Sequence, residues 1–125
     1  MSPAVPRGFA SAAYDHVETS LDLQRLLIQH PAATYFIRAQ GEGMCPVIRS
    51  GDLLVVDRSL DSKDGDIVIA ALNGELLVKQ LFKRGGIITL LSANRDYSPI
   101  DVTTGFDFQI WGVVTFIIHK TCTPS

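Results

Sequence analysis

Lys79 is the residue of this chain whose type and placement could do acid–base chemistry. It lies in the run ELLVKQLF (75–82), where Leu77, Lys79 and Leu81 are spaced by two and share one face of an expected strand. If that face is buried, loss of hydration lowers the lysine pKa and frees the neutral amine to act as a general base. If the strand lies at a sheet edge, the amine extends to solvent, which is the commoner situation for lysine. Alternation alone leaves both readings open.

A second stretch, QGEGMCPVIRSGD (40–52), has the character of a loop that presents a reactive side chain beside a glycine. Gly43 occupies the place where that side chain would be expected. Cys45 is a possible substitute nucleophile, but a lone cysteine is more often a small buried hydrophobe. Ser50 and Ser59 have no motif around them and are interpreted as turn residues.

No metal or cofactor site is expected from the remaining reactive residues. The three histidines, His16, His30 and His119, have no mutual spacing suited to a metal ion. Cys45 and Cys122 lack the paired spacing of a zinc site and are too few for a disulfide framework. A reduced, cytoplasmic setting is therefore predicted.

The composition is that of a small folded domain without a strong electrostatic field. The chain has 125 residues, of which 46% are hydrophobic and 19% charged, and its net charge is -2. That length is typical of a single domain. No direct, sequence-specific binding of nucleic acid is expected without a basic surface, and no membrane span without a run of ~20 apolar residues. A role in DNA metabolism would have to run through a protein partner.

The chain is expected to consist of a short arm followed by one domain. Residues 1–13, MSPAVPRGFASAA, are small, proline-bearing and without period, which predicts a flexible arm before a single domain over residues 14–125. Ser20 is a good N-cap, and leucines at helical spacing over residues 23–27 predict a short amphipathic helix that Pro31 ends.

Beyond this helix the pattern predicts a mostly β, mainly antiparallel fold. Runs rich in β-branched and aromatic residues predict strands over residues 34–39, 53–57, 66–72, 75–82, 87–92 and 108–119. Asn73-Gly74 predicts a hairpin with a type I′ turn, and Gly85-Gly86 predicts another. The run over 108–119 is apolar throughout, so it fits either a central strand buried on both faces or a strand at a dimer interface.

Several segments taken together resemble the LexA/UmuD family of self-cleaving S24 peptidases, and within it the UmuD type. They are DLQRLLIQHPAATYFIRAQGEGM, SGDLLVVDRSL, GDIVIAALNGELLVKQL and SANRDYSPI, and the similarity runs from about residue 8 to residue 118. The resemblance implies a β-rich fold, a homodimer, and a Ser-Lys dyad that cuts the protein's own N-terminal arm when a RecA filament on single-stranded DNA promotes it. It also implies that the trimmed dimer joins the Y-family DNA polymerase UmuC in error-prone translesion synthesis.

The family's catalytic lysine falls on Lys79, so the resemblance favours the buried reading of that residue. Its nucleophilic serine belongs to a G-[DE]-S-M segment, which here reads Gly41-Glu42-Gly43-Met44. The nucleophile position is therefore Gly43. Without a hydroxyl there is no atom to attack a peptide carbonyl and no proton for the lysine to take.

The cleavage-site position implied by the family is the bond Arg7-Gly8, and only seven residues precede it here. A short arm and a missing nucleophile agree with each other, and they predict a chain resembling the processed form, acting as a binding subunit without self-cleavage. Two alternatives remain at this stage. One is an active self-cleaving Ser-Lys peptidase, and the other is the dimerisation domain of a LexA-type repressor, against which the first 20 residues offer no helix-turn-helix pattern.

Overall fold

The computed structural model describes residues 21–122. The predicted arm (1–13), the cleavage-site position Arg7-Gly8, the N-cap Ser20 and His16 lie outside the described residues. In chain order the elements are α1 (Leu23–Leu27), the 3-10 helix η2 (Pro31–Ala33), β1 (Thr34–Arg38), β2 (Leu53–Asp57), β3 (Ile67–Leu72), β4 (Glu75–Arg84), β5 (Ile87–Leu91), β6 (Ile100–Asp101) and β7 (Phe108–Ile118).

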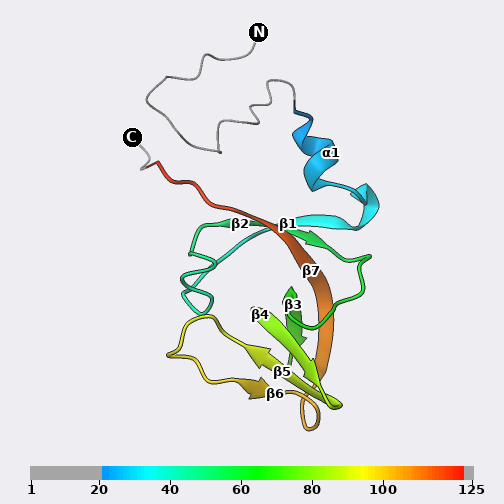
Figure 1. Cartoon of the computed structure of the whole chain (residues 1–125), viewed down its shortest axis with the longest axis vertical. Helices are drawn as coiled ribbons and strands as arrows, with labels where there is room; N and C mark the ends of the chain where they lie inside the picture. The colour runs from blue at the N-terminus through cyan, green and yellow to red at the C-terminus, as the bar shows by residue number, and fades with distance from the viewer. Residues whose placement is uncertain (1–20, 123–125) are drawn as a thin grey trace, which may run out of the picture.

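All seven strands join one sheet in the order β1-β2-β7-β3-β4-β5-β6. Every neighbouring pair is antiparallel. The predicted fold class, mostly β with one short N-terminal helix, is confirmed. Figure 1 shows β7 as the long strand that connects the β1-β2 end of the sheet with the β3-to-β6 end.

The two predicted hairpin turns are present. Asn73 and Gly74 link β3 to β4 with φ values of 49° and 84°, and Gly85 and Gly86 link β4 to β5 with 57° and 79°. Positive φ at both central positions is what a type I′ turn requires, and it suits asparagine and glycine. These turns fix the register of β4 against both of its neighbours.

Helix α1 is shorter than predicted. Its N-cap is Asp22, whose carboxylate accepts a 3.2 Å hydrogen bond from the backbone N–H of Arg25. The helix ends at Leu27, because Ile28 already has an extended backbone, and Pro31 begins η2 instead of stopping α1. The prediction of a helix running up to Pro31 was wrong. None of its residues is buried among the described residues, and Leu23 is 58% exposed.

Strand β7 is a central strand of the sheet, and its expected place at a dimer interface stays a prediction. Its first half, up to Val113, pairs with β3, and its second half, from Val113 onward, pairs with β2, so β7 lies between these two strands in the sheet. Gly112 is packed tightly against β2, since a Cβ atom added there would be 2.6 Å from Val56 Cγ1. Near its end, the side chains of Phe116 and Ile118 are exposed.

Two apolar clusters form the core, and strand β3 contributes to both. Its side chains alternate between faces, so Val68 and Ala70 enter one cluster and Ile69 enters the other. The first cluster consists of Val68, Ala70, Leu72, Leu81, Leu90, Val102 and Val113. The second consists of Ala39, Met44, Ile48, Leu54, Val56 and Ile69, and it lies under the loop that carries Gly43. Within residues 21–122, no helix is long and apolar enough to cross a membrane.

Candidate functional site

Lys79 lies in the interior of the sheet. Strand β4 is flanked by β3 and β5, and Lys79 pairs with Val68 of β3. The Leu77, Lys79, Leu81 face points inward: Leu81 is fully buried and Lys79 is only 8% exposed. The alternative of an edge-strand lysine reaching into solvent is wrong. Burial lowers the pKa of Lys79, because the protonated amine loses hydration.

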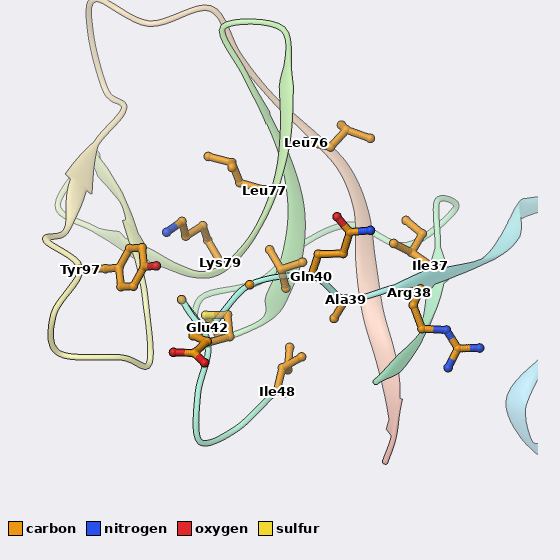
Figure 2. Close-up of a pocket in the computed structure, with 14 residues that line it drawn as sticks. Ile37, Arg38, Ala39, Gln40, Glu42, Ile48, Leu76, Leu77, Lys79 and Tyr97 are labelled. Atoms are coloured by element: carbon orange, nitrogen blue, oxygen red, sulfur yellow. The ribbon is translucent and has the colours of Figure 1, made fainter. Parts of the chain in front are cut away.

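The amine of Lys79 has two neighbours within the described part of the chain. Its Nζ donates a 2.6 Å hydrogen bond to the hydroxyl oxygen of Ser92. It also lies 5.4 Å from the centre of the Tyr97 ring, and Figure 2 shows the two side chains directed toward each other. No carboxylate among residues 21–122 lies within 4.0 Å of it. The lysine is therefore held by neutral groups.

Gly43 lies in a loop over residues 39–52 that is fixed at its base and at its tip. The base is closed by two backbone hydrogen bonds of 2.8 Å, from Ala39 N–H to Asp52 O and from Gly51 N–H to Ala39 O. Within the loop, Met44 and Ile48 are buried in the second core cluster. A loop anchored in this way holds position 43 in a defined place relative to the sheet.

Position 43 faces Lys79. A Cβ atom built on Gly43 would lie 4.0 Å from Lys79 Nζ and 3.8 Å from Tyr97 Cε1, both ordinary contact distances. Its backbone is outside the left-handed region, unlike that of Gly41, which has a φ of 81°. Neither packing nor backbone conformation requires glycine here. A serine would fit, with its hydroxyl close to the lysine amine.

The segment after β5 is attached to this loop. The backbone N–H of Asn94 donates to Gly43 O at 3.0 Å, and the Asn94 side-chain amide donates to Glu42 O at 3.0 Å. The N–H of Ala93 points to the sulfur of Met44 at 3.4 Å. These contacts hold Ser92, which directly follows β5, in a fixed position beside Lys79.

A pocket of about 340 Å³ opens at this place (Figure 2). Gly43 and Lys79 both line it, and Cys45 and Ser92 do not. Its lining comprises Ile37, Arg38, Ala39, Gln40, Gly41, Glu42, Gly43, Met44, Ile48, Leu76, Leu77, Val78, Lys79 and Tyr97. The pocket brings together the two positions that the sequence singled out, with a lysine at position 79 and no side chain at position 43.

Two aspartate–histidine pairs brace the ends of β2. The carboxylate of Asp52, 3% exposed, is 2.6 Å from His119 Nδ1, and that of Asp57, 5% exposed, is 2.5 Å from His30 Nδ1. Burial by itself raises the pKa of each carboxyl. For Asp52 the hydrogen bonds from Arg49 N–H and His119 outweigh burial and leave the pKa below its ordinary value.

The same balance holds for Asp57. Burial disfavours the charged carboxylate of Asp57 and by itself raises its pKa. Hydrogen bonds from the Ser59 side chain, from His30 and from the Ser59 backbone outweigh burial and leave the pKa lowered. Ser59 is therefore a turn residue, as predicted.

Among residues 21–122, no group of three or more histidine, cysteine or acidic side chains could hold a metal ion. His30 and His119 have structural partners that their spacing in the sequence did not reveal.

The fold and the site together define a mostly β domain with a buried lysine beside a pocket. The Peptidase S24-like family matches residues 1–115. Protein SamA of Salmonella typhimurium is 45% identical over 117 residues, covering 93% of this chain and 81% of SamA. Protein ImpA of Escherichia coli is 42% identical over 121 residues (91% and 78%), and protein MucA of Escherichia coli is 38% identical over 122 residues (94% and 83%). The chain belongs to the Peptidase S24-like family, and these relatives are UmuD-like proteins.

Proposed function

We propose that this chain is a UmuD-like accessory and regulatory subunit of an error-prone translesion DNA polymerase, acting in SOS mutagenesis without cleaving itself. The single observation that carries the second half of this proposal is Gly43. It lies in the lining of the same pocket as Lys79, at the place where a serine hydroxyl would meet the amine. On this proposal the pocket would supply the lysine for arm cleavage without the nucleophile.

A binding role is supported by apolar side chains that the described chain leaves uncovered. They lie on α1 or just before it, on β1 and near the end of β7, and they are Leu21, Leu23, Leu26, Tyr35, Phe36, Phe116 and Ile118. Exposed apolar side chains gathered at one end of a domain are candidates for protein contacts. We assign this surface, the apolar end of the sheet, to contacts with a second copy of the chain and with the polymerase.

The partners that follow from the proposal are a homodimer, a UmuC-like Y-family polymerase and the RecA filament, all in the cytoplasm. The proposal does not include direct binding of nucleic acid by this chain, because a net charge of -2 provides no general attraction to phosphates. The polymerase and the filament would bring the protein to DNA.

Co-purification tests the subunit role. Tagged chain and an untagged Y-family polymerase of the UmuC type are co-expressed, and the proposal expects the polymerase to elute with the chain. Replacing Leu23 with Asp should reduce capture at least 10-fold, whereas Ile87→Asp, an equally exposed position at the opposite end of the sheet, should leave it unchanged. Absence of polymerase from the native eluate, or equal loss in both variants, would count against the assignment.

A further inference from the structure

The hydroxyl group nearest to the buried lysine is that of Ser92. Its Oγ is 2.6 Å from Lys79 Nζ, and this is the hydrogen bond that the Lys79 side chain makes within residues 21–122. Ser92 is partly exposed and directly follows β5, whereas Lys79 is in the middle of β4. A serine hydroxyl in hydrogen-bond contact with a lysine amine is the pairing that activates an oxygen nucleophile.

We propose that Ser92 is a nucleophile for small activated acyl esters, with Lys79 as its general base. In this reading Lys79, which lacks a partner at position 43, serves a hydroxyl supplied by a different element. The pairing is independent of the polymerase role, because it uses neither the apolar end of the sheet nor the bond Arg7-Gly8.

The reaction is an ordinary acyl transfer. The neutral Lys79 amine accepts the hydroxyl proton of Ser92 as Oγ bonds to the ester carbonyl carbon. The ester C–O bond then breaks, and the alcohol leaves with that proton. Water, deprotonated by the same amine, attacks the acyl-serine, which releases the carboxylic acid and returns the hydroxyl to Ser92.

Three features prepare the pair for this chemistry. The bonds from Asn94 to Gly43 and Glu42 hold the Ser92 segment in place, so the hydroxyl does not have to be positioned during the reaction. No carboxylate in the described chain lies within 4.0 Å of the amine to favour its protonated form. Burial also lowers the pKa of Lys79, which increases the fraction of neutral base near neutral pH.

The substrate class follows from where the hydroxyl lies. Ser92 does not line the 340 Å³ pocket, so an extended peptide bound there would not lie against it. A compact acyl group with a good leaving group needs only the exposed part of Ser92. We therefore expect reaction with short-chain aryl esters and no cleavage of peptide bonds.

Steady-state hydrolysis of p-nitrophenyl acetate tests the proposal, combined with peptide mapping by mass spectrometry after rapid acid quenching. The native chain should carry an acetyl group on Ser92. Ser92→Ala should abolish the protein-dependent rate and the adduct, and Lys79→Met should lower the rate about 100-fold, in the range of general-base contributions. Ser98→Ala is the matched control, an exposed serine in the same segment, and it should keep the native rate.

The pH dependence of the acylation rate is measured on the native chain, so this part of the test does not depend on whether the Lys79→Met variant folds. The acylation rate should rise with pH and level off below pH 10.5, the ordinary pKa of a lysine. An acetyl group found on Lys79 instead of Ser92 would overturn the proposal. So would a native rate in Ser92→Ala, or a rate in the native chain that does not change with pH.

Discussion

A Cβ atom on Gly43 would lie 4.0 Å from the Nζ of Lys79 and 3.8 Å from Cε1 of Tyr97. The loop that carries Gly43 is anchored by buried Met44 and Ile48, and the strand that carries Lys79 is held between two others. The relationship between the two positions is therefore set by the fold and not by the residue at position 43. A side chain added at position 43 would meet only ordinary contacts there.

Replacing Gly43 with Ser should create a peptidase that acts on an added peptide. The new side chain meets only ordinary contacts, so the free energy of unfolding should change by less than about 1 kcal/mol. Its hydroxyl would lie close to the Lys79 amine. A synthetic peptide of residues 1–20 should be cut at Arg7-Gly8 at least 100-fold faster than by the native chain, measured by liquid chromatography and mass spectrometry.

Gly43→Ala is the matched control for that variant, since it adds the same Cβ atom without a hydroxyl. It should fold as well as the serine variant and leave the peptide intact. If Gly43→Ser is folded and cuts no faster than Gly43→Ala, then Lys79 does not serve position 43.

Replacing Lys79 with Met should change how stability depends on pH. The pKa of Lys79 is lowered in the folded chain, so between that lowered value and 10.5 the unfolded chain binds a proton that the folded chain does not. The free energy of unfolding of the native chain therefore rises with pH across this window, and below it the cost of burying the charge is fully present. Lys79→Met should be the more stable protein at pH 7, by a margin that shrinks toward pH 10.5.

Urea unfolding at several pH values between 7 and 10 checks this expectation. Lys83→Met changes an exposed lysine on the same strand and should show no such pH-dependent margin. A margin for Lys79→Met that stays constant or grows with pH would mean that the lysine is not destabilised by burial.

The elements were largely predictable from the sequence, because local composition decides them. Runs of β-branched residues became strands, and Asn73-Gly74 became the turn that its positive φ values allow. Gly43 and Lys79 were each singled out from local patterns, but their pairing was implied only by the family resemblance, since they are 36 positions apart in the sequence. Their proximity in space depends on how the loop over 39–52 packs on the sheet.

Other parts of the site had no signal in the sequence. Ser92 is a single serine after a strand, and nothing local indicates that its hydroxyl meets Lys79 across the β4-β5 hairpin. The pairing of Asp52 with His119 joins residues 67 positions apart. The end of α1 was also missed: the backbone is already extended at Ile28, three residues before Pro31.

Replacing Asp57 with Asn should destabilise the protein in a pH-dependent way. Its buried carboxylate accepts hydrogen bonds from Ser59 and pairs with His30, and its pKa is lowered. That stabilisation is present above the unfolded-state pKa of about 3.9 and is lost as pH falls through the folded-state value. We expect a loss of about 1–3 kcal/mol at pH 7 that diminishes below about pH 4.

Chemical denaturation at pH 7 and at pH 3 measures both ends of this range. Asp61→Asn, at an exposed aspartate four positions away, should have little effect at either pH. An equal loss for Asp57→Asn at both values of pH would show that its charge is not what stabilises the fold.

Replacing Gly112 with Ala should destabilise the centre of the sheet. The added methyl group would lie 2.6 Å from Val56 Cγ1, inside the closest approach that real Cβ atoms show, and Val56 is fully buried. Overpacking of this kind costs about 1–3 kcal/mol. Thermal or urea unfolding should show a loss in that range, whereas Gly43→Ala should show almost none. A Gly112→Ala protein as stable as the native chain would mean that β2 and β7 separate easily at this point.

The central claim is that the chain keeps the lysine of a self-cleaving site without its nucleophile, and so remains uncut. The most direct test is intact-mass spectrometry of the purified chain after incubation with RecA, single-stranded DNA and ATP, and in parallel at alkaline pH. We expect the full-length mass to persist throughout both incubations. A product that begins at Gly8, and that disappears when Lys79 is replaced by Ala, would contradict the account.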